Sequence, residues 1–293
     1  MTVPSSRPIR WVRPLGVAIT FTALGAGCAL FDTGGWTAAG PGRDRQTLLK
    51  PLGQAAPEAL RLEYFILERP AGDPLIGDQL WNEMVEIGLF DQKVRESLNT
   101  HGIRVGVTSS SPPQSLQKLL GEAKEITDSS IPERALRKHG QMLVLPSGGQ
   151  TEAQTSDVVE SCDVDITVDG ELQAKSFENA RGIMRVEATS QQEGWATFEF
   201  LPEIHHGSHL NRPVASTAGW QQYETGQNIQ KLYGQRFQLT LNEGDAAVVT
   251  SIGDAEDRAG RLFFRTEADG IPIQRLLVVR LLRTGETAIR KSE

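Results

Sequence analysis

The sequence has few cysteines, no excess of basic residues and no long apolar run near its start. Two cysteines in 293 residues allow one disulfide at most. The formal net charge of −7 leaves no basic stripe to neutralise phosphates, which excludes a nucleic-acid partner. A membrane-spanning helix needs about 20 apolar residues, and the apolar segment Leu15–Leu24 is too short to be a stable anchor by itself. Any attachment to a membrane therefore depends on another signal.

Sequence motifs of common enzyme classes are also missing. There is no Walker sequence and no dinucleotide fingerprint. The nearest matches to a nucleophilic serine are Ser147-Gly148-Gly149 and Thr250-Ser251-Ile252-Gly253, and neither has the G-x-S-x-G spacing or an evident histidine partner. We therefore expect no catalytic residue and no cofactor.

The N-terminus has the three parts of an export signal. Arg7, Arg10 and Arg13 give it a positive charge without any acidic residue, and the short apolar segment Leu15–Leu24 follows. The small residues Gly25-Ala26-Gly27 then suit a signal peptidase that accepts only small side chains. Residues 1–27 are thus predicted to be a signal peptide that takes the chain out of the cytoplasm.

Cys28 directly follows these small residues, and the run Leu24-Gly25-Ala26-Gly27-Cys28 resembles the lipobox of bacterial lipoproteins. The resemblance implies diacylglycerol on the Cys28 thiol, and two or three acyl chains hold a protein firmly at a membrane. Since Ala29, and no Asp, comes next, it also implies an outer membrane, with the chain facing the periplasm. The alternatives are an ordinary secretory peptide cut near Ala26 or Ala29, and an uncleaved N-terminal anchor.

The rest of the chain predicts an α+β protein. We expect a small α/β module followed by a predominantly antiparallel, sandwich-like β domain. The predicted segments are a flexible tether at 28–59, the α/β module at 60–125, the β-rich domain at 126–285 and a polar tail at 286–293.

Alternating strand and helix patterns support the α/β module. The expected strands are Leu62–Glu68 and Ile103–Val107. Helices are expected over 78–86, over 91–99 with Asp91 as the N-cap, and from Pro112 after a Ser111 cap.

Period-two hydrophobicity and regular turn signals support the β domain. The last expected strand is Gln274–Leu282, and its most apolar part, Leu276–Leu282, predicts that it is central and covered on both faces. The other expected strands are Met142–Leu145, Val164–Val168, Gln173–Ser176, Gly182–Ala188, Trp195–Leu201, Gln235–Leu241, Asp245–Ser251 and Leu262–Thr266.

Three histidines form the sharpest cluster of chemical groups. His205, His206 and His209 could share a metal ion on a helix or a strand. The flanking Pro202 and Gly207 instead predict an exposed polar loop. We therefore expect no metal ion, and we expect that removing the first two imidazoles leaves folding intact.

Two other groups lie near one strand. Asp163, Asp165 and Asp169 alternate and could offer carboxylates to calcium, although the pattern is more typical of a solvated acidic face. If Cys28 carries lipid, Cys162 has no intramolecular partner, and the neighbouring acids raise its pKa. We expect Cys162 to be a buried structural residue.

The order of elements over the last hundred residues resembles the β region of secretins, the ring-forming outer-membrane proteins of secretion systems. A strand ends at Pro202, a polar insertion follows, and then come Gly244-Asp245-Ala246-Ala247-Val248, Gly260-Arg261-Leu262-Phe263-Phe264 and the closing strand. The resemblance implies an accessory role in a secretion-type assembly that oligomerises. The insertion is too short and too polar to form the membrane hairpins of a pore.

The chain after the signal also resembles a group of uncharacterised bacterial predicted lipoproteins. The expected function is that of a non-enzymatic, envelope-anchored lipoprotein that presents its β domain to other envelope proteins or to further copies of itself. The alternatives are the secretin-like accessory component and a metal-dependent hydrolase built on the three histidines.

The lipid on Cys28 can be tested by substitution. In the Cys28→Ser variant the precursor should stay uncleaved, and the chain should move from the membrane to the soluble fraction, because the acylated thiol is gone. The measurement is fractionation with intact-mass analysis. Mature protein of unchanged mass and location in the variant would reject lipidation.

Overall fold

The computed structural model describes the chain in six stretches. They are residues 59–86, 88–123, 135–168, 170–215, 221–253 and 255–284, and the side chains of 211–215 and 221–224 are not described. Cys28, Asp169, the predicted signal peptide at 1–27 and the predicted polar tail at 286–293 lie outside the described residues, as does nearly all of the predicted tether.

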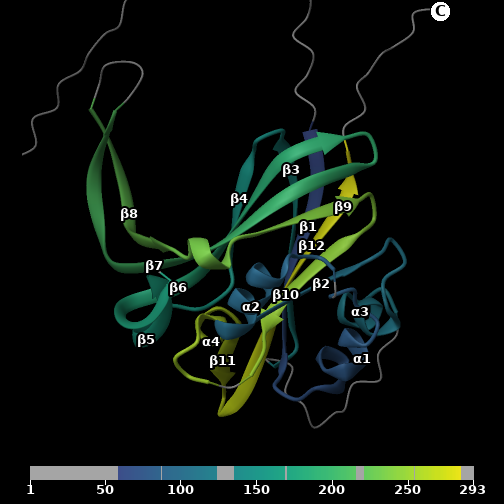
Figure 1. Ribbon diagram of the computed structural model, residues 1–293, viewed down its shortest axis with the longest axis horizontal. Coiled ribbons are helices and arrows are strands. Elements are labelled where there is room, and N and C mark those ends of the chain that lie inside the picture. Colours follow the sequence, from purple (N-terminus) through teal and green to yellow (C-terminus); the bar gives the residue numbers. More distant parts are fainter. Residues whose placement is uncertain are drawn as a thin grey trace, which may run out of the picture. The chain divides into compact units, whose positions relative to one another are not determined.

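The described residues form a mostly antiparallel β protein with few short helices and two antiparallel sheets, one of them curled into a half-barrel (Figure 1). The first sheet has the order β2 (Ile103–Thr108), β10 (Ala246–Ser251), β12 (Ile271–Arg283), β1 (Ala59–Pro70) and β3 (Arg137–Pro146), and β11 (Arg265–Ala268) also pairs with β12. The second has the order β4 (Gln150–Gln154), β6 (Glu171–Gln192), β7 (Trp195–Ala215) and β8 (Gln221–Lys231), with β5 (Val159–Val168) on β6 and β9 (Phe237–Asn242) on β7.

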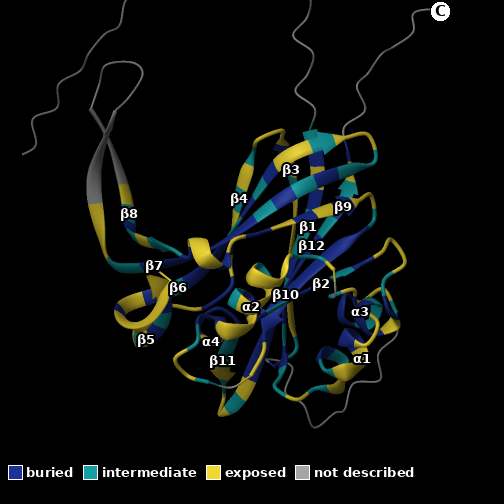
Figure 2. Ribbon diagram, in the orientation of Figure 1, coloured by how far each residue is buried: buried dark blue, intermediate teal, exposed yellow. Residues whose placement is uncertain are grey.

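The closing strand β12 is central, as the sequence predicts. It lies between β10 and β1, and Figure 2 shows buried residues along most of its length. Leu277 and Val279 contribute to the apolar cluster on one face, and Leu276 and Val278 contribute to the cluster on the other. Both faces are covered, so the continuous apolar run has a structural reason.

The larger apolar core joins the two sheets. Leu62 and Val279 enter it from the first sheet, and Val186 and Phe198 enter it from the second. All four are at most 2 % exposed, and full burial of such a side chain contributes about 1.5–3 kcal/mol. The sheets therefore share one core.

A smaller core lies on the opposite face of the first sheet, beneath short helices. Trp81 and Leu116 pack there against Val248 and Leu276. The helical elements on this side are η1 (Pro74–Ile76), α1 (Asp78–Trp81) and α3 (Gln114–Leu119). Among the described residues, no helix has both the length and the apolarity to cross a membrane.

The expected separation of an α/β module from a β domain is wrong. Strands β1 and β2 are not a sheet of their own: β1 pairs with β12 and β3, and β2 pairs with β10. These partners are far away in the sequence, so no local pattern could indicate the pairing. The helices are also too short to make up half of an α+β fold.

The predicted helices have mixed outcomes. Asp91 caps α2 (Gln92–Thr100) as predicted, and its Oδ1 accepts a hydrogen bond of 2.9 Å from the Val94 N–H. The helix expected over 78–86 has only the single turn of α1. Helix α3 begins after Pro113 and has no side-chain cap, so the predicted Ser111 cap is wrong.

Most predicted strands are confirmed, with two corrections. Residues 262–266 are not one strand, because α4 (Ala259–Phe264) holds most of them and β11 starts at Arg265. The segments expected at 173–176 and 182–188 are parts of one long strand, β6, which is 22 residues long. The strands β4 and β8 were not predicted.

Helix α4 packs unusually closely on the turn that follows α2. The N–H of Gly260 donates a 2.8 Å hydrogen bond to the His101 carbonyl. A Cβ atom at Gly260 would lie 1.9 Å from the carbonyl oxygen of Gly102, which is backbone and cannot rotate away. Glycine is therefore required at this position for steric reasons.

The Gly260→Ala substitution should separate α4 from this turn and lower the free energy of unfolding by about 2 kcal/mol, the usual cost of overpacking. Gly226→Ala is the matched control, because nothing lies within 4 Å of a Cβ at Gly226. Thermal unfolding of both purified variants gives the comparison. Equal melting temperatures would contradict the close packing.

Candidate functional site

A cleft of about 600 Å³ lies where the start of β5 faces α4 and β11. Three consecutive residues of β5, Cys162 to Val164, line it, and so do three of β11, Arg265 to Glu267. Successive side chains of a strand point to opposite faces of the sheet. A cavity on one face would therefore be lined by every second residue, whereas a cavity along the edge of a strand is lined by consecutive residues. The cleft therefore runs along two strand edges.

Both edges have room for further hydrogen bonds. Within the described residues, β11 pairs only with β12, and β5 pairs with β6. On its other edge β5 has one bridge, between Asp165 and Arg258, where the Asp165 N–H donates a 2.7 Å bond to the Asp257 carbonyl. The edge from Val159 to Asp163 faces the cleft instead.

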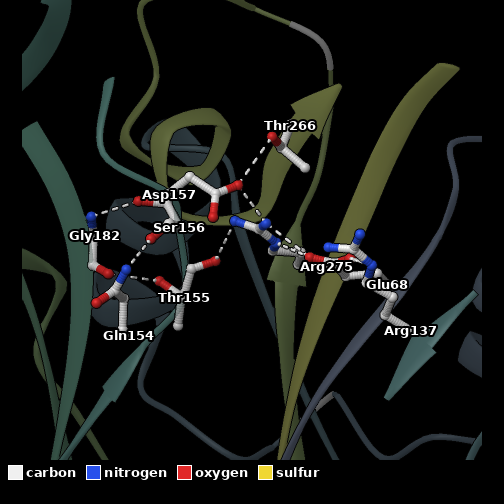
Figure 3. Close-up of polar contacts among 9 residues, drawn as sticks. All are labelled: Glu68, Arg137, Gln154, Thr155, Ser156, Asp157, Gly182, Thr266 and Arg275. Carbon is white, nitrogen blue, oxygen red and sulfur yellow. Dashed lines mark hydrogen bonds and ion pairs between the residues drawn. The ribbon is translucent and has the colours of Figure 1, made fainter. Parts of the chain in front are cut away.

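Arg275 of β12 holds the β4–β5 connector, residues 155–158, next to this cleft (Figure 3). Its guanidinium is 2.7 Å from Glu68 of β1 and 2.6 Å from Asp157, which is just before β5. It also donates a 3.3 Å hydrogen bond to the Thr155 carbonyl. Arg275 is 6 % exposed and the Glu68 side chain 12 %, so their charge-assisted bond is a strong one, whereas the Asp157 side chain is 70 % exposed and its bond is screened by water.

The same connector is bonded to the second sheet. The N–H of Gly182 in β6 donates a 2.6 Å bond to the Ser156 hydroxyl, and the Thr155 N–H and hydroxyl both donate to the Gly182 carbonyl (Figure 3). A Cβ at Gly182 would lie 2.8 Å from the Phe263 ring. One wall of the cleft, with Ser156 and Asp157, is thus fixed to both sheets.

The cleft combines an apolar lining with an acidic excess. Leu262 and Ile273 contribute apolar surface. Its six ionisable carboxylate and guanidinium residues comprise four acids, Asp157, Asp163, Glu256 and Glu267, and two bases, Arg261 and Arg265.

Two of these acids already have basic partners: Asp157 pairs with Arg275, and Glu256 lies 3.2 Å from Arg261. Asp163 and Glu267 have no ion pair to a basic side chain among the described residues. The unbalanced charge of the cleft is therefore negative.

Cys162 lines the cleft and is half-buried rather than fully buried as predicted. Burial raises the pKa of the Cys162 thiol, and the Asp163 carboxylate raises that pKa further. The thiolate is the nucleophilic form. The cleft therefore disfavours covalent chemistry at this sulfur.

The predicted histidine loop is wrong. His205, His206 and His209 all lie in strand β7, which passes through Pro202 without a break. Pro202 has no N–H to donate, and its carbonyl accepts a 3.0 Å bond from the Leu232 N–H just past the end of β8, where no ladder bond from a proline N–H is needed. A left-handed Gly207, with φ of 77°, marks an irregularity in the β7–β8 pairing and not a loop.

The structure does not bring the three imidazoles together. His205 is 7 % exposed, and its Nε2 lies 3.2 Å from Glu203. His206 lies on the other face of β7 and packs edge-on against Phe177 at 4.9 Å. Partial burial, Lys175 and His205 lower the pKa of His206. His209 is exposed, so a shared metal ion is not supported.

A different group of potential metal ligands includes Glu203, His205 and Glu152 of β4, whose ligand atoms lie within 4.8 Å of one another. Arg185 and Lys231 are 3.4 and 3.8 Å from the same Glu203 oxygen. These cations neutralise the buried carboxylate and repel a metal ion. The arrangement fits a buried ion-pair network better than a metal centre.

The other sequence candidates stay separate. Asp163 and Asp165 are on one strand, and Asp169 is outside the described residues. Ser147 lies in the turn between β3 and β4, while the Ser251 hydroxyl accepts a 2.8 Å bond from Arg265 Nε. Neither serine is hydrogen-bonded to a histidine in the described part of the chain.

Sequence reasoning missed the residues that build the cleft. Asp157, Arg265 and Arg275 lie in three separate segments, and only the sheet pairing brings them to one place. Arg275 had one available signal: it directly precedes the apolar run Leu276–Val279 of the central strand, and a charge in such a place needs a partner.

Comparison of the chain with protein-family models, with curated proteins and with solved structures found no match. The resemblances to lipoproteins and to secretins therefore stay predictions. Function has to be argued from the cleft, the strand edges and the N-terminal signal.

The Glu203 network supplies a test. Glu203→Gln removes the buried counter-charge of Arg185 and Lys231, and it should lower the free energy of unfolding by about 3 kcal/mol. An exposed polar loop, as the sequence predicts for this segment, would show no such loss of stability. His209→Ala, on the same strand but exposed, should change it by at most about 0.5 kcal/mol.

Urea unfolding of the two purified variants makes the comparison. If Glu203→Gln unfolds at the same urea concentration as His209→Ala, the network has no structural role. Stoichiometric zinc that is lost in Glu203→Gln would instead establish a metal centre.

Proposed function

We propose that this protein is a non-enzymatic component of the bacterial cell envelope that binds a partner protein at the cleft between β5 and β11. The observation that carries the proposal is the cleft itself, which lies along two strand edges and has apolar walls. Its volume of about 600 Å³ is in the usual range of binding sites.

The chemistry of the cleft favours binding over catalysis. Its arginine side chains bond to neighbouring groups: Arg261 pairs with Glu256, and Arg265 donates to Ser251. The Cys162 thiol, which faces the same space, has a raised pKa. Groups held in this way fix the shape of the walls and leave little for acid–base or nucleophilic work.

In this proposal a lipid on Cys28 holds the protein at the outer membrane, facing the periplasm. The support is the sequence alone: the basic start, the short apolar segment and the small residues before the cysteine. Residues 28–59 would then space the folded part from the lipid surface, and the partner would be another envelope protein.

Site-specific photo-crosslinking in intact envelopes tests the partner binding. A photoreactive residue replaces Val158, at the mouth of the cleft, or Leu172, a control elsewhere on the surface. The two side chains are 55 % and 52 % exposed, so non-specific crosslinking should be equal at the two positions. We expect one discrete adduct from position 158 and none from 172.

The adduct then needs a direct check. Its protein, identified by mass spectrometry and purified, should bind the purified chain. It should bind the Thr266→Trp variant, which fills the cleft, about tenfold more weakly. Identical adducts from both positions, or none from either, would contradict the proposal, and an adduct with a second copy of the chain would replace partner binding with self-assembly.

A further inference from the structure

The free edge of β5 has a defined hydrogen-bonding pattern. The Asp165 N–H points away from β6, because it donates to the Asp257 carbonyl. In an antiparallel pair the direction of the backbone groups alternates along the strand. Ser161 and Asp163 therefore direct their N–H and C=O groups away from β6 as well, and Asp163 lines the cleft.

The chain itself already uses one end of this edge. Arg258, which has an extended backbone at the end of a turn, forms a parallel bridge with Asp165, and the Asp257 carbonyl accepts the bond from the Asp165 N–H. The edge from Val159 to Asp163 continues the same line for roughly 13 Å, at about 3.3 Å per residue. Val159, Cys162 and Asp163 of this continuation line the cleft, so a further strand added to β5 would lie within it.

The walls suit the alternating side chains of such a strand. Apolar surface comes from Val164 of β5 and, across the cleft, from Leu262 of α4 and Ile273 of β12. Asp163 and Glu267 line the cleft from opposite walls, without an ion pair to a basic side chain in the part of the chain that the structure describes. Alternating apolar and basic side chains would complement both features.

We propose that an extended, alternating apolar and basic segment of the partner adds to the edge of β5 as a further strand. The backbone bonds to the outward groups of Ser161 and Asp163 give affinity, and the apolar walls and the two acids give specificity. This inference rests on the proposed function and names the class of partner segment that the cleft accepts.

Designed peptides test the inference on the full-length protein, purified in mild detergent. The probe is a fluorescein-labelled Lys-Val-Lys-Val-Lys-Val-Lys peptide, measured by fluorescence anisotropy. One control carries Glu in place of Lys, and another has the same composition in blocks of four Lys and three Val. We expect both controls to bind about tenfold more weakly, because one has the wrong charge and the other lacks alternation.

Backbone methylation distinguishes strand addition from simple charge attraction. One peptide carries N-methyl groups on its Val residues, and a second carries them on its Lys residues. In a strand only one of these two sets of N–H groups faces β5. One methylated peptide should therefore lose at least about tenfold in affinity, because it can no longer donate its backbone hydrogen bonds to β5, and the other should bind like the parent.

Two variants locate the contact on the protein. Ser161→Pro removes the outward N–H, which an edge strand tolerates, and should weaken the parent peptide about fivefold or more. Ser161→Ala keeps that N–H and is the matched control. Asp163→Asn with Glu267→Gln should narrow the preference for Lys over Glu, whereas Glu193→Gln, in the exposed turn after β6, should leave it unchanged.

Equal affinity of both methylated peptides, or no binding of the Lys-Val peptide, would overturn strand addition. The methylated peptides keep the test valid even if Ser161→Pro folds poorly. If the peptides fail while the adduct at Val158 persists, the partner binds the cleft in another way and the proposed function stands. Loss of that adduct would contradict both the proposed function and strand addition.

Discussion

The buried cation at Arg275 is the interaction on which the fold and the cleft both depend. A guanidinium that is 6 % exposed is tolerated only with carboxylate partners. Glu68 supplies the first partner from the neighbouring strand β1, directly opposite in the register, and Asp157 supplies the second from the β4–β5 connector of the other sheet. The pairing of Arg275 with both acids therefore requires the correct β1–β12 register and the correct packing of the two sheets at the same time.

This constraint also defines the candidate site. Asp157 is two residues before β5, so the ion pair fixes where the edge of β5 begins. The hairpin of β11 and β12 forms the opposite wall, and Arg275 is part of β12. The cleft is thus built from parts that the Arg275 network holds in place, as a preorganised binding surface requires.

The sequence predicts the strands well and their partners poorly, for a physical reason. The pattern of apolar residues within a segment reflects which of its faces are buried, so the continuous apolar run around Leu277 predicts a central strand that is covered on both sides. Pairing between Glu68 and Arg275, more than 200 positions apart, leaves no local trace. The errors at α4 and at His205 came from short apolar runs and isolated Pro or Gly, whose meaning depends on the surrounding structure.

A double-mutant cycle on Arg275 and Glu68 tests the central role of the buried cation most directly. Arg275→Met alone should lower the free energy of unfolding by about 3 kcal/mol, because Glu68 stays buried without its main partner. Adding Glu68→Leu should recover at least about 1 kcal/mol of this loss, because the double variant contains no uncompensated buried charge: Asp157 also loses its partner, but its side chain is 70 % exposed to water. Urea unfolding of the parent, the two single variants and the double variant gives the coupling free energy between Arg275 and Glu68. Costs that simply add, with no recovery in the double variant, would contradict the account.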